Sequence, residues 1–531
     1  MNEDYTSRVP RRAYARTLVE QESQLRDDPL LQRFAESRRR LAADRHRPIY
    51  HFVSPESSLN DPNGLCFWQG RWHLFYQGYP PEDPRQHWGH AVSDDLIHWR
   101  DLPYAIYPNP EYQCFSGATL VEPERVIAMY HGTRAGNMVA TADDPLLLNW
   151  EKLTGNAVIP IAAPGGAPLP YNVFDPCIWR KDGFYYALSG GTLPHPPSGK
   201  RTAADFLLRS RDLVTWEYLH PFVEGDRFTR VGDDGACPYF WPIGDRHILL
   251  FFSHMSGGQA LLGDYDTARD KFVVTAHADF NFGAFSPGGV HAPSATPDGQ
   301  GGVIVIFNMN PAMPTPGWDQ IMTLPRRLTL AGRESPVDLD TLLVEPAGDV
   351  VSLRGEHRHI GPTAVPANRE IVLDEIRGNA MEISAEIDVA DTNVVELNVL
   401  RSPGGEEATR IAFYRHRGYR NWQRYDGWEG TRYRQALDSL ITIDTSHAST
   451  LPDALARAPE TAPVYLGLEE PLQLRVFIDK SVVEVFVNGK QALGVRVYPG
   501  REDSLGVSLR SQSRDATLRS LDAWQLGSIY T

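Results

Sequence analysis

The central part of the chain alternates short apolar segments with turn-forming residues. Segments such as GRWHLFYQGYP, ERVIAMYHGT, RHILLFFSH and GGVIVIFNMN are separated by Gly, Pro, Asn and Asp. Runs of β-branched and aromatic residues of this length, bounded by turn formers, predict strands. We therefore expect a β-rich body that begins at about residue 47.

The first 46 residues follow a different pattern. They contain no Gly, and their apolar side chains are spaced to place one stripe along a helix or two, interrupted near Pro29. This predicts a helical N-terminal extension over residues 1–46 that packs on the body. A mobile arm is the alternative, because the segment is rich in Arg and Asp.

A weak repeat runs through the strand-rich region. The segments SDDLIHW, ADDPLLLNW and SRDLVTW end at Trp99, Trp150 and Trp216. Their spacing is close to the roughly 40–50 residues of a propeller blade with its loops. One blade cannot bury both of its faces, so the repeat predicts a ring of blades around a channel. The span over residues 47–354 fits a five-bladed β-propeller.

The C-terminal part alternates with period two and has no helical stretch. After a Pro-containing linker over residues 355–368, the segments MEISAEIDV, TNVVELNVL, LQLRVFIDKSVVEVFVNG and SLGVSLRSQS follow this pattern. Alternation with turns predicts an antiparallel β-sandwich over residues 369–531. The expected fold class is all-β, with a propeller followed by a sandwich.

Composition and charge exclude several classes of partner. The 531 residues carry a net charge of −15, which disfavours nucleic acid and anionic membranes as partners. No apolar run approaches the length of a membrane span, and the N-terminus lacks an apolar signal region. We expect a cytoplasmic protein, either a monomer or a homodimer.

The four cysteines are too few and too widely spaced for a disulfide scaffold. They are Cys66, Cys114, Cys177 and Cys237. They can serve as small buried apolar side chains, or converge around the channel. The spacing is unlike that of a zinc site, so we expect no metal and no cofactor.

The most informative segment is Asn60-Asp61-Pro62-Asn63-Gly64. An Asp directly before a Pro-Asn-Gly turn, at the start of the first predicted blade, can project into the channel mouth. Taken alone, this segment is an ordinary turn.

The segment does not occur alone, since RPIYHF, LNDPNG, FYQGYP, WGHAVSDDLIHW and FSGATL follow one another in order. Further on come VFDPCIW, ACPYFWP and GWDQIMTLPRRLTL. This succession resembles glycoside hydrolase family 32, the invertase, inulinase and levanase family, from about Arg47 to the C-terminus. The resemblance implies a five-bladed propeller that carries the active site, a β-sandwich, and retaining cleavage of fructofuranosyl linkages in a small carbohydrate substrate without metal.

The resemblance also implies roles for particular residues. Asp61 matches the nucleophile and Asp175 the transition-state stabiliser that binds ring hydroxyls. A retaining mechanism needs a second carboxyl group about 5–5.5 Å from the nucleophile, which protonates the leaving oxygen. Positions that line the sugar pocket in the family are matched by Asn60, Gln77, Trp88 and Ser116. Of these, Trp88 is expected to offer an apolar face to the sugar ring.

The chain departs from the family pattern at the acid/base position. Where the family has Glu-Cys-Pro, the sequence reads Ala236-Cys237-Pro238, and alanine cannot transfer a proton. Phe174 replaces an Arg, Ser58 replaces a Trp before the nucleophile, and Asn308 stands where a Trp is common. His291, where Tyr is common, is expected near the pocket with Phe174 and is a reserve candidate for proton transfer.

Three explanations for the missing glutamate remain open. First, Asp234 supplies the acid, because residues i and i−2 of a strand point to the same face; Asp233 is the neighbouring alternative. Second, the substrate has a leaving group that needs little protonation. General acid catalysis raises the rate roughly 10²–10⁴-fold, and such a leaving group can offset the loss of this contribution. Third, the protein is a degenerate relative that binds a sugar without chemistry.

Overall fold

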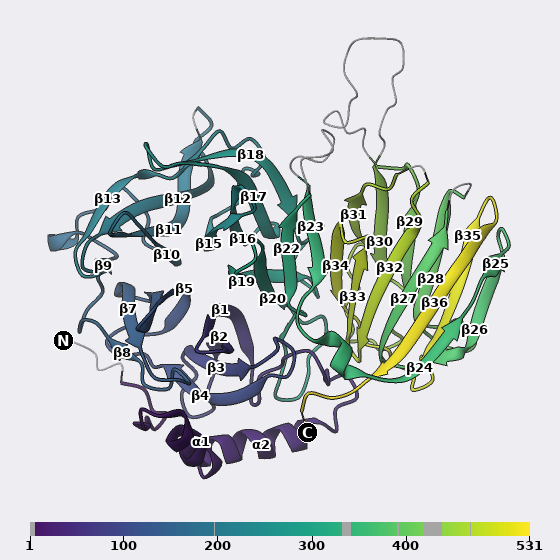
Figure 1. Ribbon diagram of the computed structural model, residues 1–531, viewed down its shortest axis with the longest axis horizontal. Coiled ribbons are helices and arrows are strands. Elements are labelled where there is room, and N and C mark those ends of the chain that lie inside the picture. The colour runs from purple at the N-terminus through teal and green to yellow at the C-terminus, as the bar shows by residue number, and fades with distance from the viewer. Residues whose placement is uncertain are drawn as a thin grey trace.

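The protein consists of two β domains that lie side by side, with two helices along one side of the first (Figure 1). The computed structural model describes residues 6–195, 197–331, 341–389, 392–418, 438–467 and 469–530. The larger part of the first domain is a ring of sheets, and the second is a pair of facing sheets. The predicted all-β class, with a propeller and a sandwich, is confirmed.

The N-terminal extension forms α1 (Leu18–Arg26) and α2 (Pro29–Leu41). The Asp28 side chain accepts a hydrogen bond from the Leu30 amide and Pro29 occupies the first turn, which together favour a helix start at this point. The apolar face of α2 packs on the propeller, where Phe34 meets Tyr104 edge to face at 5.9 Å. The predicted helical extension is confirmed.

Five sheets form the propeller, and their strands pair antiparallel except for β14, which pairs with β18 in parallel. Their inner strands contact one another in a closed ring, β1 to β5, β10, β15, β19 and back to β1. Blade by blade, the strands are β1 (Leu59–Trp68), β2 (Arg71–Gly78), β3 (His87–Ser93), β4 (Arg100–Ile106); β5 (Cys114–Glu122), β6 (Arg125–Gly132), β7 (Gly136–Ala142), β8 (Glu151–Lys152), β9 (Ile159–Pro160); β10 (Pro176–Lys181), β11 (Phe184–His195), β12 (Lys200–Ser210), β13 (Trp216–Pro221); β14 (Val223–Glu224), β15 (Ala236–Ile243), β16 (Arg246–Ser253), β17 (Gly257–Asp266), β18 (Lys271–Asp279); and β19 (Val290–Pro297), β20 (Val303–Met309), β21 (Ile321–Met322), β22 (Arg326–Leu330), β23 (Leu342–Pro346). A short 3₁₀ turn, Pro164–Gly166, precedes the third blade.

The sequence repeat marks the turn before the outer strand of a blade. In the first blade, Asp95 Oδ1 accepts hydrogen bonds from the amides of Ile97 and His98. In the third, Asp212 Oδ1 does the same for Val214 and Thr215. An Asp that satisfies the amides two and three residues ahead forms a compact turn, so the repeated Asp is a structural device rather than a site.

The second domain is a sandwich of two sheets, whose apolar inner faces pack together into one core. One sheet contains β24 (Arg354–Ile360), β25 (Thr363–Val365), β36 (Ala516–Leu526), β27 (Ala380–Asp388), β32 (Leu472–Asp479), β33 (Val482–Val487) and β34 (Gln491–Arg496). The other contains β26 (Glu370–Arg377), β35 (Gly506–Gln512), β28 (Val394–Arg401), β29 (Thr409–Tyr414), β30 (Ser439–Asp444) and β31 (Glu460–Val464).

The predicted linker over residues 355–368 is wrong. A 3₁₀ turn at Val350–Leu353 leads directly into β24, and both β24 and β25 pair with β36. The run is polar because β24 is an edge strand whose side chains are mostly exposed. Such an edge carries no apolar alternation, which is why the sequence resembled a linker.

A buried ionic network fastens the two domains together. His51, just before the first blade, lies 2.9 Å from Asp479 and 3.1 Å from Glu484 of the sandwich. Glu484 also pairs with Arg326 of the fifth blade at 2.7 Å. All four side chains have 0% exposure. The two acidic side chains of the sandwich therefore compensate the buried positive charges of His51 and Arg326.

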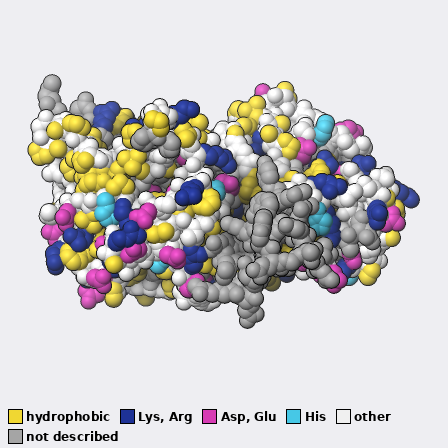
Figure 2. Space-filling model, turned by 90° about the horizontal axis from the view of Figure 1, so that it is seen from above, with side chains coloured by type: hydrophobic (Ala, Val, Ile, Leu, Met, Phe, Trp, Pro, Cys, Tyr) yellow, Lys and Arg dark blue, Asp and Glu magenta, His cyan; other side chains and the backbone are white. Residues whose placement is uncertain are grey.

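In the part of the chain that the structure describes, neither helix has the length and hydropathy to cross a bilayer. On the face shown in Figure 2, acidic and basic side chains lie interspersed rather than gathered into one field.

Candidate active site

The candidate site lies where the five inner strands begin. In four blades the inner strand carries a β-bulge near its start, seen as register shifts in β1, β5, β15 and β19. A bulge re-aims a side chain and interrupts pairing, which suits the rim of a channel. The residues at these starts are Asp61, Ser116, Cys237 and His291; in the remaining blade, Asp175 directly precedes β10.

Asp61 is a buried carboxylate held by several donors. Its side chain is 12% exposed. Oδ2 accepts hydrogen bonds from Ser116 Oγ at 2.6 Å and Gln77 Nε2 at 3.2 Å. Burial raises the pKa of Asp61, but donation from His291, Ser116 and Cys237 outweighs burial, so the pKa lies below its ordinary value. Asp61 is therefore ionised at neutral pH.

Asp175 lies beside Asp61, but its pKa is shifted in the opposite direction. It is 4% exposed, and its Oδ2 accepts the backbone N–H of Cys237 at 3.2 Å. Burial and the nearby charge of Asp61 raise the pKa of Asp175 to about 7. Two carboxyl groups that share a buried site cannot both ionise easily. Asp175 Oδ1 is buried without a hydrogen-bond partner among the described residues, whereas Asp61 Oδ1 has His291 Nδ1 beside it at 3.3 Å.

Cys237 joins the two carboxyl groups. Its Sγ lies 3.6 Å from Asp61 Oδ2 and 3.5 Å from Asp175 Oδ2. The residue has a φ of 50°, in the left-handed region that a non-glycine residue rarely adopts. This conformation, at the bulge of β15, accompanies the donation of its N–H to Asp175. Sequence reasoning placed Cys237 only in a motif and missed this contact.

Tyr239 closes the channel below the carboxylates. Its hydroxyl accepts a hydrogen bond from the amide of Gly64 at 3.1 Å and donates to the carbonyl of Gly117 at 2.8 Å. Ser294 Oγ lies 2.9 Å from the same hydroxyl. One buried phenol thus links four blades, so the channel ends in a pocket floor instead of running through the ring.

An amide network extends from Asp61 toward the rim. His291 Nδ1 lies 3.3 Å from Asp61 Oδ1 and 3.1 Å from Asn308 Nδ2. Asn308 Nδ2 also donates to Asn60 Oδ1 at 3.1 Å and to Gln320 Oε1 at 2.6 Å. The structure therefore brings the predicted residues Asn60 and His291 together at the nucleophile candidate.

One predicted pocket residue, Trp88, has a different environment from the one expected. Trp88 is 0% exposed, and its indole N–H donates to the carbonyl of Phe115 at 2.9 Å. The expectation that Trp88 offers a face to the sugar is wrong, because Phe75 and Tyr130 pack on the ring instead. Phe174 lies beside the site, packed against the apolar cluster that contains Cys237. It is half-buried, and its ring is tilted against that of His131 with centroids 5.2 Å apart.

The predicted acid Asp234 is already engaged by a histidine. His254 Nδ1 lies 2.7 Å from Asp234 Oδ2, and the His254 amide donates to Asp234 Oδ1 at 2.9 Å. Ala236, at the position expected for the family glutamate, is buried and pairs with Phe252 on β16. Asp233 is fully buried, so it is a structural residue rather than an acid.

The cysteines do not form a common site. All four are free and buried. Cys66 and Cys114 share one apolar cluster, whereas Cys177 and Cys237 belong to two others. Among the described residues, no group of three or more His, Cys, Asp or Glu side chains is arranged to hold a metal ion.

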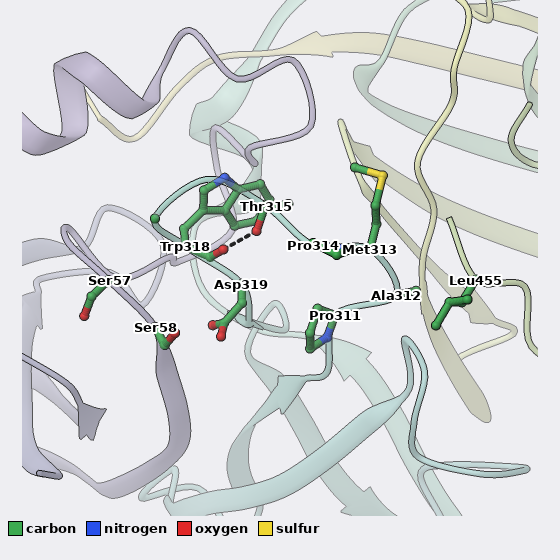
Figure 3. Close-up of a pocket in the computed structure, with 11 residues that line it drawn as sticks. Ser57, Ser58, Pro311, Ala312, Met313, Pro314, Thr315, Trp318, Asp319 and Leu455 are labelled. Carbon is green, nitrogen blue, oxygen red and sulfur yellow. Dashed lines mark hydrogen bonds between the residues drawn. The ribbon is translucent and has the colours of Figure 1, made fainter. Parts of the chain in front are cut away.

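A cavity of about 530 Å³ lies beside the site entrance (Figure 3). Ser57 and Ser58, which precede β1, form one side, and the loop with Trp318 and Asp319 forms another. Leu455 of the sandwich completes the wall. A second cavity of about 360 Å³ shares Ser57, Ser58 and Asp319 and reaches Gln320 of the amide network. Together, the two cavities can accommodate a group attached to a ligand that is bound at Asp61.

The arrangement supports displacement at an acetal carbon. An ionised carboxylate whose second oxygen contacts only His291 can attack, and a nearby neutral carboxyl group can bind a hydroxyl of the same ring. Among the described residues, no positive side chain of Lys or Arg forms an ion pair with either carboxylate.

Both domains match models of one known protein family. Residues 51–346 match the family model described as Glycosyl hydrolases family 32 N-terminal domain, and residues 349–525 match the one described as Glycosyl hydrolases family 32 C terminal. Sucrose-6-phosphate hydrolase of Escherichia coli is 27% identical over 529 residues, covering 90% of this chain and 95% of the relative. Levanase of Bacillus subtilis (strain 168) is 25% identical, covering 91% and 71%.

Solved structures show the same fold. Fructan 1-exohydrolase IIa from Cichorium intybus has a TM-score of 0.76 at 20% identity, covering 91% of this chain and 98% of that chain. The same values hold for a variant of that enzyme in complex with 1-kestose. A Bombyx mori β-fructofuranosidase mutant in complex with sucrose has a TM-score of 0.67 at 21% identity, covering 96% and 99%.

Proposed function

The chain belongs to glycosyl hydrolase family 32, whose members are β-fructofuranosidase-like glycosidases, and we propose that it cleaves a β-fructofuranoside or related furanoside with retention of configuration. In this proposal Asp61 attacks the anomeric carbon and forms a covalent glycosyl ester. Water then releases the sugar from Asp61.

The environment of Asp61 carries the proposal. A carboxylate that is buried yet ionised is a competent nucleophile, because little water competes for its free oxygen. Ser116 and Gln77 occupy Oδ2, which leaves Oδ1 for the attack. His291 beside Oδ1 must shift its contact when the ester forms.

Asp175 has a complementary role in the proposal. Its pKa of about 7 means that it is largely neutral below neutral pH, which limits repulsion with Asp61. When Asp61 becomes an ester, its negative charge disappears, so the pKa of Asp175 falls. Asp175 then ionises more readily and strengthens its hydrogen bonds to the sugar hydroxyls as positive charge develops on the ring.

The substrate class follows from relatives and from the cavity. Relatives act on sucrose-6-phosphate and levan by name, and solved relatives bind 1-kestose and sucrose. The cavity between Ser58, Trp318 and Leu455 supports a leaving group attached to the sugar at the floor. Phe174, in place of the family arginine, favours a less polar contact at the rim.

The test combines turnover with stereochemistry. Purified protein is incubated with sucrose, sucrose-6-phosphate, 1-kestose, levan and 4-nitrophenyl β-D-fructofuranoside, and the first-formed anomer is identified by NMR. We expect turnover of at least one furanoside with retention, and its loss in Asp61→Asn but not in Asp94→Asn, a change at an exposed acid. Binding of a fructoside without turnover would instead support the sugar-binding alternative and contradict the proposal.

A further inference from the structure

The reaction proposed above needs a proton donor that faces the leaving group. Asp61 is the nucleophile and ionised, so it cannot donate. Asp175 is 4% exposed, and in the proposed reaction it binds the sugar ring and not the group that departs toward solvent. His291 is 8% exposed, with its Nδ1 against Asp61 and Asn308. The donor must come from the open side of the pocket.

Strand pairing places His254 at that side. Ala236 of β15 pairs with Phe252 of β16 in an antiparallel register. Two residues further out on both chains, this register sets Asp234 opposite His254, on the same face as Ala236. The hydrogen bonds of 2.7 and 2.9 Å between Asp234 and His254 agree with this placement.

The histidine lies next to the catalytic pocket. The ring of Phe252 contacts the ring of His254 at 4.9 Å and the ring of His291 at 3.9 Å, measured between centroids. His291 in turn touches Asp61. The His254 side chain is 57% exposed, so it borders both the pocket and solvent.

The turn that carries His254 is fixed by a buried acid. Asp233 Oδ1 accepts hydrogen bonds of 2.7 Å from both Ser253 Oγ and Ser256 Oγ. Asp233 is fully buried, and the two serines flank His254 in sequence. The backbone at His254 is therefore anchored although its ring reaches solvent.

The charges around His254 favour its protonated form. The hydrogen bond that His254 donates to Asp234 raises the pKa of His254, burial opposes this, and the charges of Asp234, Asp175 and Asp61 raise the pKa further. Because Nδ1 donates to Asp234, the proton available for transfer sits on Nε2. Among the described residues, Nε2 has no hydrogen-bond partner.

We propose that His254, oriented by Asp234, is the general acid and base that acts where the family glutamate is missing. As Asp61 attacks the anomeric carbon, the bond to the leaving oxygen breaks and His254 Nε2 gives that oxygen its proton. Neutral His254 then takes a proton from the water that attacks the same carbon. The ester bond to Asp61 breaks, and the imidazolium and the Asp61 carboxylate are restored. Asp234 is the positioning residue.

This inference rests on the proposed function, and the kinetic test separates the two. His254→Gln is compared with His98→Gln, which removes a histidine with the same 2.7 Å bond to an aspartate at a remote outer turn. On sucrose, whose leaving group departs poorly without a proton, His254→Gln is expected to lose roughly 10²–10⁴-fold in kcat/KM. On 4-nitrophenyl β-D-fructofuranoside it should lose under about tenfold, since nitrophenolate departs without a proton.

Asp234→Asn supplies a readout that a purely structural role would not move. It should shift the alkaline limb of the kcat/KM profile to lower pH, because His254 loses the partner that raises its pKa. In histidine labelled with ¹³C, the NMR titration of His254 should likewise shift to lower pH in Asp234→Asn and in Asp61→Asn, and stay unchanged in His98→Gln.

The outcomes are distinct. If the wild type turns over furanosides and His254→Gln keeps its rate and pH profile on sucrose, the inference is overturned while the proposed function stands. If no furanoside is cleaved by the wild type, the proposed function fails and the acid role fails with it. A His254 titration that does not respond to Asp61→Asn overturns the placement of His254 independently of turnover.

Discussion

Cys237 donates its backbone N–H to Asp175 at 3.2 Å while its thiol lies 3.5 Å from the same carboxyl oxygen. Burial, followed by the charges of Asp61 and Asp175, raises the pKa of the thiol well above its usual range. The thiol therefore remains protonated and acts as a weak donor to the carboxylates. It is neither a nucleophile nor a metal ligand in this environment.

The first prediction concerns thiol reactivity. All four cysteines are buried, and burial raises the pKa of each thiol. We expect the native protein to resist 5,5′-dithiobis(2-nitrobenzoate) and four thiols to react after unfolding in guanidinium chloride. Fast labelling of one native thiol, with loss of turnover, would show that Cys237 is accessible and contradict its place between the carboxylates.

The second prediction concerns stability and pH at Asp175. Its pKa is raised to about 7 in the folded protein, so the stability it contributes is present below about pH 4 and is lost as pH rises through 7. Asp175→Asn removes this loss. It should therefore stabilise the protein at pH 8, by up to about 4 kcal/mol, and have little such effect at pH 4.

Thermal unfolding of the Asp175→Asn variant at the two pH values measures the difference. Asp94→Asn, at an 84% exposed side chain, is the control and should change neither Tm. Equal effects of Asp175→Asn at pH 4 and pH 8 would mean that the carboxyl group is not held neutral by its surroundings.

The third prediction concerns the donors to Asp61. Ser116→Ala removes a 2.6 Å hydrogen bond to the ionised form, so the pKa of Asp61 should rise. A hydrogen bond to a charged group is worth about 1.5–3 kcal/mol, which corresponds to roughly 10- to 100-fold in kcat/KM. The acidic limb of the pH profile should move to higher pH.

Ser93→Ala provides the matched control for this change. It removes a 3.0 Å bond from a buried serine to Asp95 at an outer turn. Its pH profile should match that of the wild type. An acidic limb that does not move in Ser116→Ala would imply that another group sets the ionisation of the nucleophile.

The fourth prediction concerns the network between the domains. Glu484→Gln leaves His51 and Arg326 with one buried carboxylate fewer, and breaking a buried pair in this way costs about 3–5 kcal/mol. Guanidinium unfolding should show this loss. Glu386→Gln, in an exposed pair with Arg519, should change the free energy of unfolding by less than about 1 kcal/mol.

The same network gives stability a pH dependence. Burial lowers the pKa of His51, but hydrogen bonds and charges from Asp479 and Glu484 raise it to about 9. A raised histidine pKa stabilises the fold below about pH 6.5, and this contribution is lost as pH rises through 9. A free energy of unfolding that stays flat from pH 6.5 to 9 in the wild type would contradict a charged His51.

The fifth prediction concerns the cavity beside the entrance. Leu455→Glu places a charge in the wall shared by the sandwich and the propeller (Figure 3). We expect kcat/KM to fall for furanosides with a large leaving group and to stay constant for methyl β-D-fructofuranoside. Val372→Glu, at another exposed apolar side chain of the sandwich, should leave kcat/KM unchanged for both kinds of substrate. Equal losses on both substrates would exclude this cavity as the leaving-group site.

The sequence carried most of the information on fold and much of that on the site. Alternating runs and the Trp99, Trp150 and Trp216 repeat were sufficient for the propeller, because each repeat is one blade. Asp61 and Asp175 could be brought together only through the family resemblance, since contacts between blades leave no periodic signal. The edge strand β24 was missed because its side chains are polar on both faces.

Other site features depended on tertiary structure. The burial of Trp88 follows from packing by Phe75 and Tyr130, which residue type alone does not show. His254 ends an ordinary strand and belongs to no motif. Its link to Asp234 follows from the register between Ala236 and Phe252, which could be known only once the strands were paired.

The central claim is that Asp61 forms a covalent bond to a sugar. Mass spectrometry of enzyme that is acid-quenched during turnover of 4-nitrophenyl β-D-fructofuranoside tests it most directly. The account predicts an added mass of one sugar residue on the peptide containing Asp61, absent in Asp61→Asn and present in His98→Gln. Turnover with no adduct and with inversion at the anomeric carbon, or an adduct on another residue, would contradict it.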